Sequence, residues 1–373
     1  MKKYHALIWI ILFLNLTILP ILAFFFLEKY SDLENRENRK AEVKPVLRMN
    51  NYKTFPEEYE AYFDDRIPFR NQLIRFNNTI DYYVFKQSSN DNVCIGKDGW
   101  LFYSNKSDGN PVEQSLGYWN FSDEELEIIA ANLESGKEIL ESSGIDFVLF
   151  IAPNKETIYI DKLPDYYEIK SQYTATDCLV DYLRENTDIT IVYPKEELMA
   201  YRVEDPDMLL YYKLDTHWNS IGAYIGAQCL TDVLGIELPP LNELSVNQIL
   251  TSRGDLTDML NIEISDGDID YKIDGISELS IETIKLDFAT EFVYHTSEAD
   301  PRTLVVCRDS FSTALAPSLA AQFEDSFWIH NQVFDQQQIF DYGADIFVLE
   351  VVERQVRSLE EFRITEGVQL SNS

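Results

Sequence analysis

Short apolar runs alternate with helix-forming stretches after residue 146, and no other feature constrains the fold as strongly. Five runs rich in β-branched and aromatic residues are predicted to be strands: 147–151, 189–193, 303–307, 327–329 and 346–350. Helices are predicted between them, over 177–185, from 195, over 313–323 and over 336–342. This order predicts an α/β fold with a mostly parallel sheet covered by helices on both faces. In such a sheet, ligands bind beyond the carboxyl ends of the strands.

Two segments before the sheet predict smaller elements. Residues 56–85 carry apolar positions at helical spacing and are interrupted by Pro68, which predicts two short helices. Residues 93–103 hold two apolar runs around a turn-forming Asp98-Gly99 pair, which predicts a hairpin.

Two further segments lie between the predicted strands. A run at 208–212 predicts a strand, and a helix is predicted over 220–234. Residues 261–300 break the alternation and predict an inserted or peripheral β element.

The amino-terminal segment predicts a membrane anchor. Residues 6–27 contain no charged side chain, and as a helix they are long enough to cross a hydrocarbon layer of about 30 Å. Lys2 and Lys3 precede this run, which places the amino terminus in the cytoplasm. We therefore expect residues 1–30 to form a cytoplasmic tip and transmembrane signal anchor, 31–50 a solvated stalk, and 51–373 a domain outside the cytoplasm at the cell membrane. A cleaved signal peptide is the alternative, disfavoured by the bulky residues around Phe24.

The charge of the chain bears on possible partners. A formal net charge of −33 argues against nucleic acid, because phosphate binding requires a clustered cationic surface. Cys94, Cys178, Cys229 and Cys307 could pair in an exported protein or remain free, and their spacing does not resemble that of a metal or redox motif. We expect no metal and no diffusible cofactor.

Three residues could form a nucleophilic site. The chain contains four histidines, and only His217 has a carboxylate, Asp215, two residues away. A serine hydroxyl needs a neutral imidazole to take its proton and a carboxylate to orient that imidazole. Ser310 follows a predicted strand and precedes a predicted helix, which would place its hydroxyl at the carboxyl edge of the sheet. Each segment alone has an ordinary structural explanation, a loop hydrogen bond for Asp215 and His217 and a helix cap for Asp309.

Several blocks of the chain resemble one family. The blocks are 95–103, Pro153-Asn-Lys155 with Tyr159, Asp215-Thr-His217-Trp218, Arg253-Gly-Asp255-Leu256 and Arg308-Asp-Ser310-Phe311. Together they resemble the SGNH-like polysaccharide O-acetyltransferases of the alginate-acetylating AlgJ and AlgX type. The resemblance implies an SGNH-hydrolase-like sheet in circularly permuted order, with the Asp-His pair before the serine. It also implies that Ser310 accepts the acyl group, His217 is the base and Asp215 orients it. Arg308 stands where the usual motif has glycine, which leaves its role open.

The resemblance sets the functional expectation. We expect an O-acetyltransferase that passes acetyl groups to hydroxyls of a polysaccharide acceptor. A membrane-bound acetyl exporter, an acyltransferase of the MBOAT type, would supply the acetyl groups. Backbone amides near Ser310 and Phe311 would hold the oxyanion. Arg308, Lys155 and Arg354 are candidate substrate contacts, with structural ion pairing as the alternative for the last two. Two other hypotheses are a carbohydrate acetylesterase with the same triad and a non-catalytic glycan-binding or assembly protein.

Overall fold

The structure is a computed structural model that describes residues 2–27, 42–251, 254–262, 264, 267–275 and 281–365. The chain divides into two compact units. The first consists of residues 1–89 and 257–263, and the second of residues 90–256 and 264–373. Residues 28–41, which include residues 31–41 of the predicted stalk, lie outside the described residues.

The first unit is helical. Its helices are α1 (Lys2–Leu27), α2 (Phe55–Asp65) and α3 (Arg70–Ile80), and α3 continues as the π-helical η2 (Asp81–Phe85). The two helices predicted over 56–85 are therefore present. They separate after Pro68 because Phe69 adopts a left-handed backbone conformation with φ of 62°. Phe24 of α1 is buried, with its ring 4.7 Å from that of Phe63 in α2.

The amino-terminal helix is as long as predicted, but its membrane-spanning character is not supported. Within the described part of the chain, no helix combines the length and the apolarity needed to cross a membrane.

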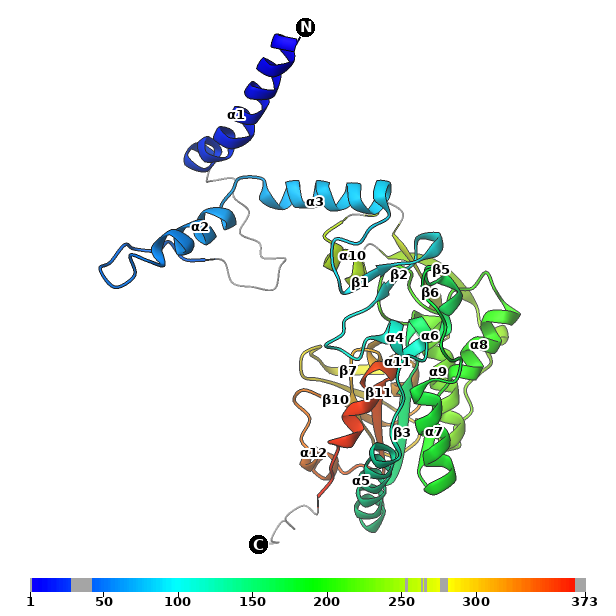
Figure 1. Ribbon diagram of the computed structural model, residues 1–373. Coiled ribbons are helices and arrows are strands. Elements are labelled where there is room, and N and C mark those ends of the chain that lie inside the picture. Colours follow the sequence, from blue (N-terminus) through cyan, green and yellow to red (C-terminus); the bar gives the residue numbers. More distant parts are fainter. Residues whose placement is uncertain are drawn as a thin grey trace. The chain divides into compact units, whose positions relative to one another are not determined.

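A seven-stranded sheet forms the centre of the second unit (Figure 1). Its strand order is β4-β3-β11-β9-β10-β8-β7, and the first five of these strands run parallel. The parallel strands are β4 (Thr190–Val192), β3 (Asp146–Ala152), β11 (Ile346–Val352), β9 (Leu304–Arg308) and β10 (Asp325–His330). Each end of these five strands lies within two residues of the corresponding end of the predicted run. The α/β fold with a mostly parallel sheet is confirmed.

Helices cover both faces of this sheet, because alternate side chains of each buried strand point to opposite sides. In β3, Phe147, Leu149 and Ile151 face one core, while Val148 and Phe150 face the other. The first core is closed by α5 (Asp123–Ser142) and α7 (Ala175–Asn186), and the second by α9 (Ser220–Leu234) and α11 (Ser312–Ala320). The other helices of this unit are α4 (Pro111–Ser115), α6 (Lys155–Ile158), α8 (Lys195–Glu204) and α12 (Gln337–Asp341), whereas α10 (Asp255–Leu260) begins in this unit and ends in the first.

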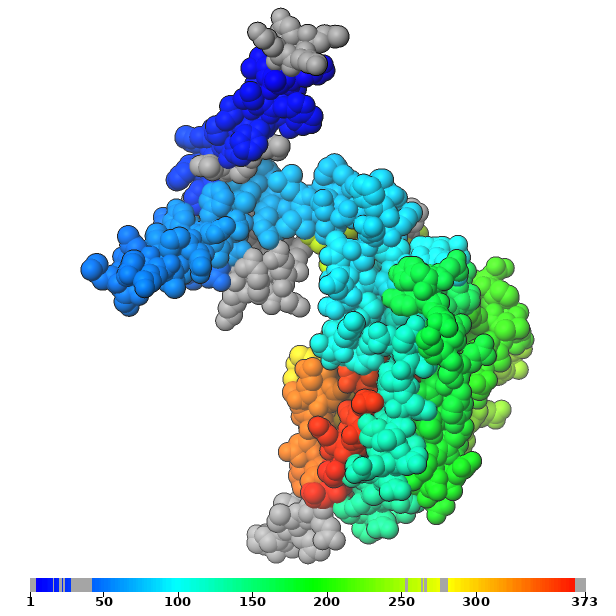
Figure 2. Space-filling model, viewed as in Figure 1, coloured from blue at the N-terminus to red at the C-terminus, as the bar shows by residue number. Residues whose placement is uncertain are grey.

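The carboxyl-terminal segment closes the first of these cores. After β11, the 3-10 helix η6 (Glu353–Glu360) packs on α5. Figure 2 shows its red surface against the teal surface of α5. Val356 and Leu359 of η6 are buried there.

The described residues of 261–300 form β structure at one edge of the main sheet and in a separate pair of strands. The region contributes β6 (Asp268–Ile273), which pairs with β5 (Val246–Thr251), but its other strands extend the main sheet. β8 (Glu291–Thr296) pairs antiparallel with β10, and β7 (Ile281–Leu286) pairs with β8 through a register shift between Thr283 and Lys285. The hairpin β1 (Val93–Ile95) and β2 (Leu101–Tyr103) is present as predicted.

The strand predicted over 208–212 is absent. That stretch makes only an isolated bridge between Tyr211 and Trp218, on either side of the Asp215-Thr-His217 segment. The prediction was wrong because this apolar stretch packs into the core without a neighbouring strand with which to pair: Leu210 and Tyr211 are fully buried.

Candidate active site

Ser310 lies in the three-residue connection between β9 and α11, at the carboxyl end of the sheet. Asp309 fixes this connection, since one carboxylate oxygen accepts the Phe311 N–H at 2.8 Å and the other accepts the N–H of Val352, at the end of β11, at 2.8 Å. Beneath it, buried Glu350 accepts the Asp309 N–H at 2.6 Å. The serine is thereby held at the edge of the sheet with a partly exposed side chain.

Asp215 and His217 lie in the loop that leads to α9, and long-range contacts hold this loop. The fully buried Lys155 ammonium donates to the carbonyl oxygens of Tyr212, Lys213 and Asp215, at 3.2, 3.4 and 2.6 Å. From the other side, the Asp268 carboxylate accepts the N–H groups of Lys213 and Leu214 at 3.0 and 2.6 Å. These contacts satisfy backbone groups that a strand would otherwise have paired.

The two segments meet at the histidine. His217 Nδ1 lies 2.6 Å from Asp215 Oδ1, and His217 Nε2 lies 2.7 Å from Ser310 Oγ. The indole N–H of Trp218 donates to the Phe311 carbonyl at 2.9 Å, which ties the loop directly to the serine turn. The three residues predicted as a triad are therefore brought together in the order serine, histidine, aspartate.

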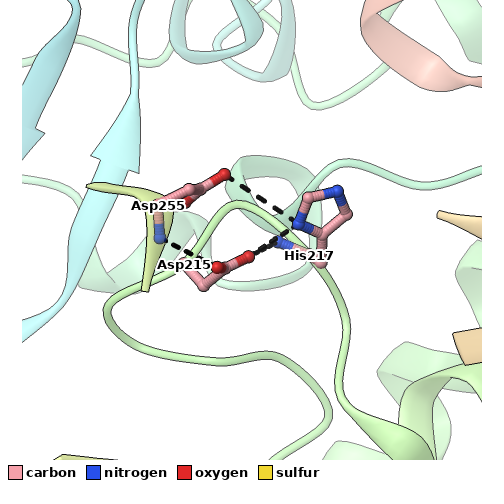
Figure 3. Close-up of side chains that lie close together, drawn as sticks. All are labelled: Asp215, His217 and Asp255. Atoms are coloured by element: carbon pink, nitrogen blue, oxygen red, sulfur yellow. Dashed lines mark hydrogen bonds and ion pairs between the residues drawn. The ribbon is translucent and has the colours of Figure 1, made fainter. Parts of the chain in front are cut away.

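A second carboxylate, which was not among the predicted site residues, approaches the histidine (Figure 3). Asp255 Oδ2 lies 3.9 Å from His217 Nδ1, and the Asp255 N–H donates to Asp215 Oδ2 at 2.9 Å. Asp255 also binds Thr216, accepting its hydroxyl at 2.6 Å and its N–H at 2.8 Å. The glycine before it permits this approach, because a Cβ on Gly254 would lie 2.1 Å from the Leu214 carbonyl oxygen. The Arg253-Gly-Asp255-Leu256 block was the only signal in the sequence.

The electrostatics of this cluster favour a charged Asp215. Burial raises the pKa of Asp215, but hydrogen bonds from His217 and from the Asp255 amide, together with the charge of His217, lower it to about 2. Burial lowers the pKa of His217. The hydrogen bond to Asp215 and the charges of Asp215 and Asp255 raise this pKa by more, so it lies above 6.5. Burial and the neighbouring charge of Asp215 raise the pKa of Asp255.

The same three side chains could hold a cation. Ligand atoms of Asp215, His217 and Asp255 lie within 4.8 Å of one another. The Nδ1 atom of His217, however, is the one that bonds Asp215. In this arrangement the imidazole is oriented for proton transfer at Nε2 toward Ser310.

Two cavities open beside Ser310. The first, about 750 Å³, is lined by His217 and Asp215 and by mostly aromatic and aliphatic side chains, including Tyr212, Tyr271, Phe311 and Ile273. The second, about 600 Å³, is more polar and is lined by Asp309, Glu350, Arg354, His330 and Asn331. Among the residues that the structure describes as lining them, Ser310 is common to both.

The predicted substrate contacts differ in their outcome. Lys155 is fully buried with its ammonium bonded to loop carbonyls, so it positions the loop instead of facing a substrate. Arg308 is also buried, donating to the Phe288 carbonyl at 3.0 Å and stacking 3.9 Å from the Phe292 ring, so it does not face either cavity. The Phe311 N–H, predicted as an oxyanion donor, already donates to Asp309. Arg354 does line the second cavity.

An α/β sheet with a serine at a strand-to-helix turn, beside a histidine and an aspartate, is an arrangement that recurs in serine hydrolase-like domains of several folds. The chain belongs to the family described as SGNH hydrolase-like domain, acetyltransferase AlgX, whose model matches residues 93–281. Ser310 lies beyond the matched residues. The fold class is thus established as SGNH-like, whereas the predicted circular permutation is not supported.

Curated relatives and solved structures agree with this assignment. The probable alginate O-acetylase AlgJ of Pseudomonas aeruginosa is 26% identical over 211 residues, which cover 55% of this chain and 50% of that protein. The chain spans about half the length of the curated relatives it matches. Bacillus cereus PatB1 with a sulfonyl adduct matches the fold with a TM-score of 0.53 and 16% identity, covering 73% of this chain and 98% of that one. A DHHW family protein from Eubacterium siraeum matches with a TM-score of 0.52 and 16% identity, covering 73% of this chain and all of that one.

Proposed function

We propose that this protein is an O-acetyltransferase that carries an acetyl group on Ser310 and passes it to a hydroxyl of a polysaccharide. The observation that carries the proposal is the 2.7 Å contact between His217 Nε2 and Ser310 Oγ, with Asp215 at the other ring nitrogen. The acetyltransferase family and the curated relatives, named probable alginate O-acetylases, support the acyl group and the class of acceptor.

The first half-reaction loads the serine. His217 Nε2 accepts the hydroxyl proton as Ser310 Oγ attacks the acetyl carbonyl carbon, and the carbonyl electron pair moves onto oxygen. The tetrahedral intermediate then expels the leaving alcohol, which takes the proton back from His217. Charged Asp215 stabilises the imidazolium that exists between these two steps.

The second half-reaction transfers the acetyl group to the sugar. His217 now accepts the proton of an acceptor hydroxyl, whose oxygen attacks the acetyl-serine carbonyl. Collapse of this second intermediate breaks the bond to Ser310 Oγ, which recovers its proton from His217. The acceptor must approach from the first cavity, since His217 lines that cavity.

The alternatives of esterase and glycan-binding protein make different predictions for the same residues. A non-catalytic protein would not need the Ser310 hydroxyl on the wall of two cavities and within hydrogen-bond distance of a histidine. An esterase would use the same residues with water as the acceptor.

The proposal also includes a location outside the cytoplasm and delivery of acetyl groups by a membrane-bound exporter. These parts rest on the sequence and on the family. Attachment through residues 6–27 stays a prediction, which fractionation of cells producing the full chain would test.

Mass spectrometry after exposure to an acetyl donor tests the proposal. Incubation of the full chain with 4-nitrophenyl acetate should give a peptide containing acetylated Ser310, and Ser310→Ala should remove this modification. Addition of acetylatable polysaccharides should then discharge the acetyl group to sugar faster than water does. Discharge to water alone would identify an esterase, and an unmodified Ser310 would refute covalent catalysis.

A further inference from the structure

Two residues that line the second cavity each have a buried polar atom without a hydrogen-bond partner. Among all described residues, four buried side-chain atoms lack such a partner, and two of them, Glu350 Oε1 and Arg354 Nε, belong to residues that line this cavity. A buried polar atom left without a hydrogen bond costs about 1–3 kcal/mol. Two residues with such atoms line one cavity beside a proposed nucleophile. They point to a polar ligand that would supply the missing hydrogen bonds.

The Arg354 guanidinium contacts two aromatic rings and forms an ion pair with Asp108. Its charged group lies 5.5 Å from the centre of the Phe311 ring and 5.6 Å from that of Tyr103, distances at which a cation is attracted to an aromatic ring. Asp108 Oδ2 lies 3.4 Å from Nε but forms no hydrogen bond with it, in a side chain that is 13% exposed. The guanidinium is therefore pre-organised at the wall of the second cavity.

The position of the histidine indicates what this donor would meet. In attack on a carbonyl, the base lies beside the attacking oxygen, and the carbonyl oxygen points away from the base toward separate donors. His217 lines the first cavity and, within the described residues, not the second. The Phe311 N–H already donates to Asp309 and does not stabilise the oxyanion. A charged donor in the second cavity would supply part of that stabilisation.

We propose that the second cavity receives the carbonyl end of the acetyl donor, an ester of acetic acid, and that the Arg354 guanidinium donates a hydrogen bond to its oxygen. This proposal rests on the proposed function. When Ser310 Oγ bonds to the carbonyl carbon, the carbonyl π pair becomes a lone pair on oxygen, and Arg354 stabilises that negative charge. When the alcohol or Ser310 Oγ leaves, the pair returns to reform the carbonyl. Arg354 keeps its proton throughout.

Glu350 fits the same ligand. Burial and the charge of Asp309 raise the pKa of Glu350 well above its usual value, which favours the protonated form of the carboxyl group, the form that can donate as well as accept. An acetyl group offers only hydrogen-bond acceptors. A protonated carboxyl group and a guanidinium at the cavity wall can both donate to such acceptors.

Acylation kinetics of Arg354→Gln test this proposal. With 4-nitrophenyl acetate and the full chain, we expect the rate constant for acetylation of Ser310 to fall about 100-fold with KM changed less than about threefold, since loss of one oxyanion donor lowers kcat by about 10²–10³. Arg357→Gln is the matched control. Arg357 lies on the same η6 segment, is half exposed and pairs with Glu125 at 3.5 Å, and it should leave the rate within twofold.

The outcomes separate this proposal from the proposed function. If the unmodified chain is acetylated on Ser310 and Arg354→Gln is acetylated within threefold of the same rate, Arg354 is not an oxyanion donor, although covalent catalysis stands. If the unmodified chain itself is not acetylated, the proposed function fails first. Should Arg354→Gln not fold, Arg354→Lys decides, since it keeps the charge and moves the donor. A loss of tenfold or more supports the proposal and an unchanged rate overturns it.

Discussion

Ser310 lies in a short connection between a strand and a helix, whereas Asp215 and His217 lie in a loop that follows no strand. The serine turn is fixed by its neighbour Asp309 and by the adjoining strand β11. The histidine loop is fixed by groups far away in the chain, above all Lys155 and Asp255. One half of the site is therefore specified largely by regular structure, and the other by tertiary contacts. The first half should tolerate loss of single supporting contacts better than the second.

Removal of either reacting group should have the largest effect. Ser310→Ala and His217→Ala should each lower the rate of acetyl transfer by about 10⁴-fold or more, since members of a serine triad act as a unit. The rate of 4-nitrophenolate release measures this. Thermal unfolding of Ser310→Ala should match that of the unmodified chain, because this residue contributes its hydroxyl to the site and little to the core, whereas His217→Ala also removes the partner that stabilises charged Asp215. A variant retaining even a tenth of the activity would show that the two halves do not work together.

Asp215→Asn should come next, with a loss of acetyl-transfer rate of about 10³–10⁴-fold, because an amide cannot stabilise the imidazolium and favours the wrong tautomer.

The stability of the fold should also change with pH in a defined direction. The pKa of Asp215 is lowered to about 2, so its contribution to stability is present above the unfolded pKa of about 3.8 and is lost as the pH falls toward 2. Acid unfolding followed by circular dichroism should therefore show a smaller decrease in stability across that range for Asp215→Asn.

Support for the two halves can be compared directly through Lys155→Met and Ser312→Ala. Lys155→Met leaves three loop carbonyls without their charged donor and should destabilise the fold by about 3 kcal/mol. Ser312→Ala removes one hydroxyl bond to Glu350, 3.0 Å long, and should cost about 1 kcal/mol. Urea unfolding measures both. Lys213→Met, in the same loop but with its ammonium outside this network, is the control and should change stability by less than about 0.5 kcal/mol. Equal effects for Lys155→Met and Ser312→Ala would break the comparison.

The smallest effect is expected for Asp255→Asn, with less than about a tenfold loss of activity. The base must be neutral, so activity should rise with pH through the pKa of His217, which lies above 6.5. The charge of Asp255 contributes to raising that pKa, and its removal should shift the acidic limb of the pH–rate profile to lower pH. A profile that stays in place would assign Asp255 to loop geometry alone.

The sequence predicted the serine half better than the histidine half for a physical reason. The strand before Ser310 and the helix after it have local periodicities, and both appear where expected. Lys155 has no local signal for its role, because its three acceptors lie about sixty residues later and burial cannot be inferred from a charged side chain. Likewise, the pairing of β7 and β8 with the main sheet depends on contacts across the chain. The residue types suggested the pairing of Ser310 with His217, and the family resemblance strengthened it.

The two edges of the central sheet bear on how this protein behaves in concentrated solution. Open edges invite strand-by-strand association between copies, and proteins suppress it with short strands, charges and bulges. Here β4 has only three residues, and β7 is exposed, interrupted by its register shift and charged by Glu282 and Lys285. With a formal net charge of −33 adding repulsion between copies, we expect the folded chain to resist aggregation through its edges even where many copies are crowded together.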